Sequence, residues 1–359
     1  FGATFGGTVD GFPVSGFLQW SDTNIFGTGR DFSIGTTLSP DTQSITMSLS
    51  DDWVGNKRWS NGLSFSFERS VRDNALQRGT GSDYYDGRDR NNETYPLGFT
   101  SNAAWQAADK RSSASIDHMS YDFYSFSLGY STGYTFNFRP GDLSISAGLS
   151  IGLSHAVYDD MYDPYELLIK KYHDRWQFSN KLSLSIAWDG RDLVTDTTRG
   201  YLLSASYTYA GGFLGGLSNY NRISLSAAGY VPLFTYVNEE GRSSSLVFSA
   251  TTSFSIMLPQ FWNNTDTNGS GWGWYTPQQG ATRYEMLYLD GMNTGRGFGT
   301  VLDQGMIWHN QLELSYPLVR NVLNVEGYLS ADGIYDYVDE MNGFGDLRWY
   351  FSGGFGIKL

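Results

Sequence analysis

The sequence predicts an all-β protein, a transmembrane antiparallel β-barrel, and three observations support this. Charged residues make up only 17% of the 359 residues, below the roughly 25% of an average soluble domain. No run of about 18 apolar residues occurs, which excludes membrane-spanning helices. Apolar and small polar residues alternate along much of the chain, as in strands with one apolar face. A lipid-facing chain without such helices must form a closed barrel to satisfy its backbone.

The alternation is clearest at residues 141–158, where apolar residues are separated by Ser or Gly. Such a strand turns one face to lipid and the other to a lumen. Fourteen segments of this kind can be read, with lengths that suit tilted strands crossing a bilayer. In chain order they are 1–7, 13–21, 30–39, 43–53, 61–71, 118–131, 141–158, 177–189, 200–211, 219–232, 243–258, 306–317, 323–336 and 346–359.

The connections favour a membrane barrel over a soluble β-sandwich. Three are long, at 72–117, 159–176 and 259–305, and they follow the fifth, seventh and eleventh segments. All three therefore leave from one rim, whereas the connections after even-numbered segments are short. This sorting is typical of outer-membrane barrels.

Tryptophans near segment ends fit the aromatic girdles at the two lipid–water interfaces. These tryptophans are Trp20, Trp53, Trp59, Trp176, Trp188 and Trp349. Ordinary core aromatics are the alternative interpretation.

Composition and motifs argue against several other function classes. A net charge of −13 does not suit a nucleic-acid partner, and the absence of cysteine excludes disulfides and thiolate metal sites. Residues 148–152 spell the nucleophile elbow of hydrolases but lie in mid-strand. The four histidines, His118, His155, His173 and His309, show no metal-ligand spacing. We therefore expect no enzyme, metal or cofactor. The chain starts inside a strand pattern, so we expect a processed or excised piece.

The long connection at 259–305 carries the candidate functional motif Arg296-Gly297-Phe298. Glycines on both sides of Arg296 allow a sharp turn that presents one charge and one aromatic ring. A solvated surface arginine is the alternative interpretation. Glu313 and Asp332 fall on the inward faces of the two following segments. Because an arginine fork can bond two carboxylates, we expect these acids to hold Arg296 in the lumen.

From its first to its last residue, the chain resembles the barrel of the BamA family of outer-membrane β-barrel assembly factors. Residues 22–29 resemble the family's Asp-Asn-Trp-Leu-Gly-Thr-Gly turn, and residues 188–200 resemble its Asp-Arg…Gly-Ser-Arg turn. Residues 294–298 correspond to the Val-Arg-Gly-Phe signature of its sixth extracellular loop, with Gly295 in place of a branched residue. Glu313 and Asp332 match the positions that hold that arginine.

The resemblance also predicts the domain organisation. We expect residues 1–359 to form one outer-membrane β-barrel domain, without the periplasmic POTRA repeats that precede the family's barrel. The family barrel has sixteen strands and normally ends on an aromatic residue, whereas fourteen are readable here and the chain ends at Leu359. Either the last two strands are missing from this chain or the barrel closes differently.

The function implied by the resemblance is folding and insertion of β-barrel proteins into the bacterial outer membrane. The expected partners are nascent barrel proteins, accessory lipoproteins and the lipid bilayer. An edge strand with unpaired backbone groups can template another strand. The expected seam is short and glycine-rich, with few side chains to fix its register: Phe1, Gly2, Ala3, Thr4, Phe5, Gly6 and Gly7. A related two-partner-type secretion translocator and a passive porin are the alternative functions.

Overall fold

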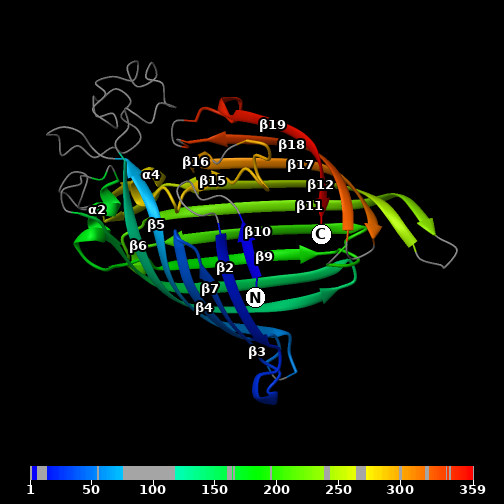
Figure 1. Cartoon of the computed structure of the whole chain (residues 1–359), viewed down its shortest axis with the longest axis horizontal. Helices are drawn as coiled ribbons and strands as arrows, with labels where there is room; N and C mark the ends of the chain where they lie inside the picture. The colour runs from blue at the N-terminus through cyan, green and yellow to red at the C-terminus, as the bar shows by residue number, and fades with distance from the viewer. Residues whose placement is uncertain are drawn as a thin grey trace.

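The structure is a computed structural model, and one antiparallel sheet of 15 strands dominates it. Figure 1 shows the strands following one another around a curved wall. The structure describes residues 2–5, 14–54, 56–75, 118–159, 164, 166–194, 196–237, 243–263, 272–298, 301–319, 323–336, 338 and 341–358.

The sheet order follows the chain order, with the two-residue β8 (Gln177–Phe178) pairing beside β7. The strands on the main path are β1 (Gly2–Phe5), β2 (Val14–Asp22), β3 (Asp31–Leu38), β4 (Thr42–Asp51), β5 (Trp59–Ala75), β6 (His118–Phe138), β7 (Gly141–Val157), β9 (Lys181–Asp189), β10 (Gly200–Ala210), β11 (Tyr220–Val237), β12 (Ser243–Leu258), β17 (Met306–Val319), β18 (Leu323–Tyr335) and β19 (Arg348–Lys358). Every predicted segment contributes a strand, so the predicted fold class is confirmed.

Among the strands that run further than the sequence pattern predicted, β6 and β11 extend furthest past their expected ends. The sixth segment was expected to end at 131, but β6 continues to Phe138 because its outward aromatic alternation persists past Gly133. The tenth was expected to end at Pro232, which cannot donate a ladder hydrogen bond. β11 instead continues to Val237, because a register shift after Pro232 accommodates the missing donor.

Short elements lie between these strands. They are the 3-10 helices η1 (Ile25–Gly27), η4 (Gly212–Leu214) and η6 (Phe344–Asp346), the helices α2 (Leu167–Asp174) and α4 (Pro277–Gly280), and the paired strands β13 (Gln260–Asn263) with β14 (Trp272–Tyr275) and β15 (Leu287–Leu289) with β16 (Val301–Gln304). Within the described ranges, no helix has the length and apolar character needed to cross a membrane.

The two faces of the sheet differ as the alternation predicts. On β7 the outward Ile145, Leu149 and Ile151 are exposed, whereas the inward Ser154 is buried. Inward hydroxyls of neighbouring strands hydrogen-bond each other, at 2.6–2.9 Å between oxygens: Ser33–Ser48, Ser66–Ser127, Ser146–Ser185, Ser204–Ser226, Ser224–Ser255 and Ser330–Ser352. The lumen wall is therefore polar, uncharged along these rows and largely satisfied by its own partners.

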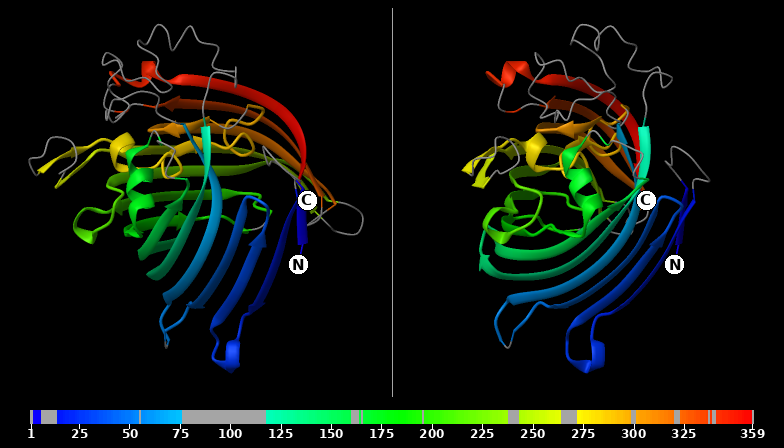
Figure 2. Two further views of the ribbon diagram at one scale, coloured as in Figure 1. Left: turned by 60° about the vertical axis from the view of Figure 1, so that its left-hand side comes forward. Right: turned by 90° about the vertical axis from the view of Figure 1, so that its left-hand side faces the viewer.

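The buried core lies inside the curve of the sheet, where loop segments pack against its inner face. Figure 2 shows α2, α4 and the β15–β16 segment gathered there. In one cluster, Leu168, Ile169 and Tyr172 of α2 pack against Tyr121 and Phe123 of β6. Two further clusters join residues of the long loop to the wall: Ala281 and Met286 with Ala210, Tyr220 and Met257, and Leu289 with Ile307 and Ile334. Apolar burial thus holds the loop in the lumen.

The two edges of the sheet are unequal. In the described part of the chain, β1 pairs with β2 and β19 pairs with β18, and each is the end of the sheet path. β1 contributes four residues, whereas β5 pairs with β6 along seventeen. The start of β1 and the end of β19 lie near each other in all three views of Figures 1 and 2. Among the described strands on the main path of the sheet, the first is therefore joined to its neighbour by the fewest residue pairs.

Candidate functional site: the lumenal loop and the sheet edge

The tip of the long loop is a turn organised by Asp290. Its carboxylate accepts hydrogen bonds from the backbone N–H groups of Met292, Asn293 and Thr294 at 2.8–2.9 Å. Burial alone would raise the pKa of the Asp290 carboxyl, but the hydrogen bonds from Thr294, Asn293 and Met292 outweigh it and lower the pKa to about 2. The turn is therefore held by an ionised carboxylate throughout the physiological pH range.

Two glycines let the chain turn around Arg296. Gly295 and Gly297 have φ angles of +64° and +84°, in the left-handed region that glycine tolerates best. A Cβ on Gly295 would also lie 3.1 Å from Leu289. The backbone N–H of Phe298 closes the turn by donating to the Gly295 carbonyl at 3.0 Å. These glycines allow the arginine and the phenylalanine to project from one tight turn.

Arg296 is held by groups from its own loop and from β18. Its Nε donates to the Met292 carbonyl at 2.9 Å, and Nη1 lies 3.2 Å from Oε1 of Glu326. The guanidinium carbon is 4.4 Å from the ring centroid of Tyr328, within cation–π range. Glu326 is buried. The arginine therefore neutralises a carboxylate that the lumen has largely removed from water.

Phe298 extends the contact to the last strand. Its ring meets Tyr350 of β19 edge to face, with centroids 5.0 Å apart and planes at 75°, a favourable aromatic geometry. The three residues of the predicted motif therefore lie against the lumenal side of β18 and β19. This places the loop tip beside the carboxyl-terminal edge of the sheet.

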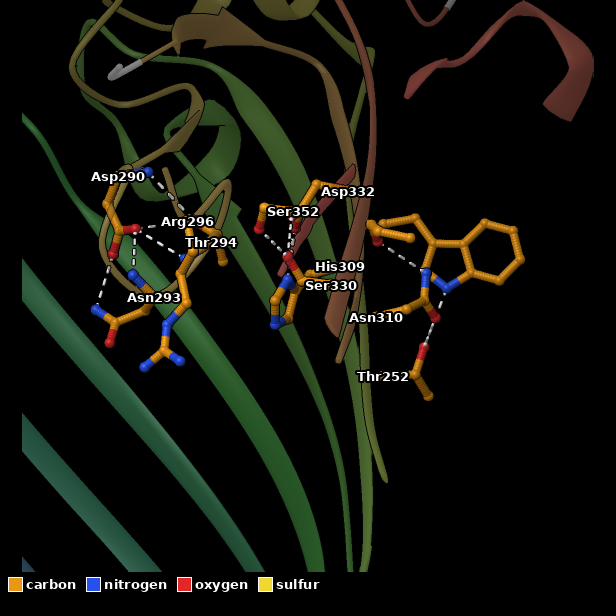
Figure 3. A network of polar contacts seen from close by, with 12 residues as sticks. Thr252, Asp290, Asn293, Thr294, Arg296, His309, Asn310, Ser330, Asp332 and Ser352 are labelled. Carbon is orange, nitrogen blue, oxygen red and sulfur yellow. Dashed lines mark hydrogen bonds and ion pairs between the residues drawn. The ribbon is translucent and has the colours of Figure 1, made fainter. Parts of the chain in front are cut away.

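The acid that meets Arg296 differs from the expected pair, Glu313 and Asp332. Asp332 lies six residues beyond Glu326 on β18, about 20 Å at the rise of a strand, so one arginine cannot bond both. Asp332 instead accepts from Nδ1 of His309, its register partner on β17, at 2.5 Å. Glu313 accepts from Gln311 at 3.0 Å. Figure 3 shows Arg296 and the His309–Asp332 pair as separate groups.

The sequence contained a partial signal for Glu326. It lies on the same inward face of β18 as Asp332, between the outward Val325 and Gly327. Alternation assigns a residue to one face of the sheet. It does not say at which position along β18 the loop tip contacts the wall. His309 was missed for a related reason, because only the β17–β18 register places it opposite Asp332.

A partly buried ion pair fixes the middle of the loop to the opposite wall. Glu285 lies 3.0 Å from Nζ of Lys181 on β9 and accepts from the hydroxyl of Ser218 at 2.7 Å. Arg222 of β11 donates to the Glu285 carbonyl. Burial opposes ionisation of Glu285, but the Lys181 ammonium and the hydrogen bonds from the Ser218 hydroxyl and the Thr282 backbone lower its pKa below the usual value. The loop therefore spans the lumen from β9 and β11 to β18 and β19.

A second polar cluster joins the loop to the segment before α2. The carboxylate of Glu166 accepts from the backbone N–H of Arg283 at 3.1 Å, and Arg283 Nε lies 3.2 Å from Asp303. Burial raises the pKa of Glu166 to about 7, with Asp303 adding repulsion. Burial likewise raises the pKa of Asp303, against the attraction of Arg283. Burial thus raises the pKa of both acids, so the docking of this cluster is sensitive to pH.

The predicted seam residues are partly placed. Gly2, Ala3, Thr4 and Phe5 form β1 and pair antiparallel with Phe17, Gly16, Ser15 and Val14. Phe1, Gly6 and Gly7 lie outside the described residues. Four of the seven predicted seam residues therefore belong to β1.

A curved antiparallel sheet with an apolar outer face, a hydroxyl-lined inner face and a long loop anchored in its lumen defines an outer-membrane β-barrel. The chain belongs to the Omp85 superfamily, whose domain matches residues 24–359. It is an outer-membrane protein.

A known relative agrees with this assignment. A Treponema pallidum protein provisionally described as an outer membrane protein assembly factor is 26% identical over 344 residues, which are 94% of this chain and 38% of that protein. The chain thus spans well under half the length of this relative.

Solved structures share the fold. BamA from Haemophilus ducreyi, solved without POTRA domains 1–3, matches with a TM-score of 0.59 and 15% identity, covering 96% of this chain and 61% of that one. CdiB from Escherichia coli matches with a TM-score of 0.56 and 12% identity, covering 96% and 53%. At these identities the likeness concerns the fold alone.

Proposed function

We propose that this barrel is an insertase that helps other β-barrel proteins fold into the outer membrane. The observation that carries the proposal is the unequal sheet edge. β1 is joined to the sheet by four residue pairs, and two of them contain glycine, Gly2↔Phe17 and Ala3↔Gly16. Few side chains therefore fix the register of this strand. Its outer edge offers backbone donors and acceptors on which a client strand could form.

The lumenal loop would support this role by holding the other edge. Arg296 contacts Glu326 and Tyr328 on β18, and Phe298 contacts Tyr350 on β19. The loop is also tied to β9 and β11 through Glu285. One side of the seam is thus braced from inside while β1 is free to exchange partners. Catalysis here means lowering the barrier to strand pairing in lipid, with no covalent step and therefore no enzyme chemistry.

A secretion translocator is the second candidate, and the lumen wall favours it. Cross-strand serine pairs satisfy one another, so a passing polypeptide would find few unpaired groups to retain it. A translocator would have to move the loop, because the loop packs against both sides of the lumen. A passive porin is less compatible with a lumen that contains this loop.

The discriminating experiment uses the full-length protein in liposomes of defined lipid. An insertase should accelerate the folding of an added unfolded barrel protein, measured by its heat-modifiable gel mobility, and should conduct ions poorly. Export of a soluble protein without faster barrel folding would instead assign a translocator. Steady conductance without either activity would assign a porin. Nascent barrel proteins are the expected partners in the first case, and accessory lipoproteins would be identified by co-purification.

A further inference from the structure

The lipid-facing side of the sheet contains an apolar groove of about 660 Å³. It crosses strands from β5 to β11, opposite the proposed seam in the order of the sheet. Outward side chains form its walls: Trp59, Thr132, Tyr134, Phe136, Ile145, Ala147, Leu184, Ile186, Ala205, Tyr207, Ile223 and Leu225. The lining also includes Gly133, Ser146, Ser185 and Ser206.

Two alanines create the hollow. Ala147 on β7 lies between Thr132 and Leu184 on its neighbours. Ala205 on β10 lies between Ile186 and Leu225. A short side chain beside taller ones on the same face leaves a depression, because neighbouring outward residues stand roughly perpendicular to the sheet. The outward side chains of five adjoining strands, β6, β7, β9, β10 and β11, therefore form the groove.

One end of the groove lies at the lipid–water boundary. Trp59 begins β5 immediately after a short turn, and Phe136 lies near the end of β6 before the next turn. Trp59 stacks edge-on with Tyr134 at 5.8 Å, and its Nε1 donates to Thr132 at 2.9 Å. Aromatic residues of this kind mark the membrane interface. The short turns of an outer-membrane barrel face the periplasm, so the groove begins in the periplasmic leaflet.

Cationic side chains lie on the two turns at this end. Thr135 donates its N–H to the Arg58 carbonyl at 3.2 Å, and the Arg58 guanidinium donates to Asn137. The turns that carry Lys57 and Arg139 are therefore adjacent, and both of these residues are exposed. Exposed cations at the headgroup level suit a phosphate.

We propose that this groove binds one acyl chain of a glycerophospholipid of the periplasmic leaflet, with the lipid phosphate beside Lys57 and Arg139. A protein strand would find no open ladder there, because β6, β7, β9, β10 and β11 are each paired on both sides. An acyl chain needs only apolar contact, which the groove supplies. The site does not depend on the proposed insertase activity.

Lipid titration of the purified, delipidated full-length protein tests this site. Phosphatidylglycerol binding is measured by native mass spectrometry, and the wild type should bind a first lipid more tightly than later ones. The double variant Ala147→Phe with Ala205→Phe fills the groove and should weaken the first site about tenfold, the scale of roughly two lost methylene contacts. Ala250→Phe is the matched control, an outward alanine on β12 outside the groove, and should bind as the wild type does. Equal binding by the two variants would overturn the proposal.

Two further measurements separate the parts of the site. Lys57→Gln with Arg139→Gln should weaken phosphatidylglycerol binding and leave diacylglycerol, which lacks the phosphate, unchanged. Unchanged phosphatidylglycerol binding would remove the headgroup assignment.

If the phenylalanine variants fail to fold, alkylation of single-cysteine variants tests the groove instead, since the native chain contains no cysteine. Added lipid should slow the alkylation of Ala147→Cys relative to Ala250→Cys. Equal rates, or protection by a co-purified protein instead, would contradict lipid binding.

Discussion

The guanidinium of Arg296 lies 3.2 Å from the carboxylate of Glu326, a buried acid on the lumenal face of β18. The same guanidinium lies over the ring of Tyr328, two residues further along that strand. An acid in this position is costly to ionise without a cation. The contact therefore ties the loop tip to the wall next to the last strand.

Loss of the arginine should release the loop tip. We predict that Arg296→Ala leaves Glu326 uncompensated, costing about 2 kcal/mol of loop docking, because both side chains are mostly removed from water. Limited proteolysis should then cut within residues 282–298 faster than in the wild type. Adding Glu326→Gln should recover part of the protection, whereas adding Glu313→Gln should not. Rescue by the Glu313 change alone would reverse the assignment of the partner.

The shape of the cation should matter as well as its charge. Arg296→Lys keeps the charge but loses the planar group that reaches Met292, Glu326 and Tyr328 together. We therefore expect Arg296→Lys to give intermediate protection. Tyr328→Phe should stay close to wild type and Tyr328→Leu should lose about 1 kcal/mol, because only the former keeps the ring face. Hydrogen exchange of the loop measures the protection in the Arg296 and Tyr328 variants. Equal protection in Tyr328→Phe and Tyr328→Leu would rule out the ring contact.

Docking of the long loop against Glu166 should weaken as pH rises, because burial opposes ionisation of Glu166 more strongly than Arg283 favours it. The pKa of Glu166 is raised to about 7 in the docked state, whereas a solvated glutamate titrates near 4.3. In the docked state Glu166 therefore stays protonated to a higher pH than it does in solvent. Docking is strongest below about pH 4, and its free energy falls by on the order of 3 kcal/mol by pH 7–8. Glu166→Gln should remove this dependence. Hydrogen exchange around α2 at pH 5 and pH 8 tests it, and a docked state that tightens with pH would contradict the sign.

Client proteins should meet the first strand. In the full-length protein, Ala3→Cys should form disulfide crosslinks to a cysteine-bearing barrel protein during its assembly. Leu149→Cys is the control, because β7 is already paired with β6 and β9 along its length. The absence of native cysteine makes each crosslink unambiguous. Crosslinking of equal yield at both positions would argue against templating at β1.

The sequence alone was sufficient to predict the strands and the loop motif of the candidate site. Alternation in β7 depends only on which side of the pleat each residue faces, which is a local property. The same is true of the turn at Arg296, where Gly295 and Gly297 supply the positive φ angles. The sorting of long and short connections by parity needed only the strand count. These features follow from neighbours along the chain, so a single sequence contains them.

Contacts between distant segments were decided by the tertiary structure. Glu326 became the partner of Arg296 because the loop, anchored at Glu285, reaches β18 at that level. His309 met Asp332 through the β17–β18 register, and the groove at Ala147 and Ala205 required the registers of several strands at once. Alternation fixes the face of a residue but leaves its height and its cross-strand neighbour open, since these depend on how separate strands slide and tilt when the sheet curves.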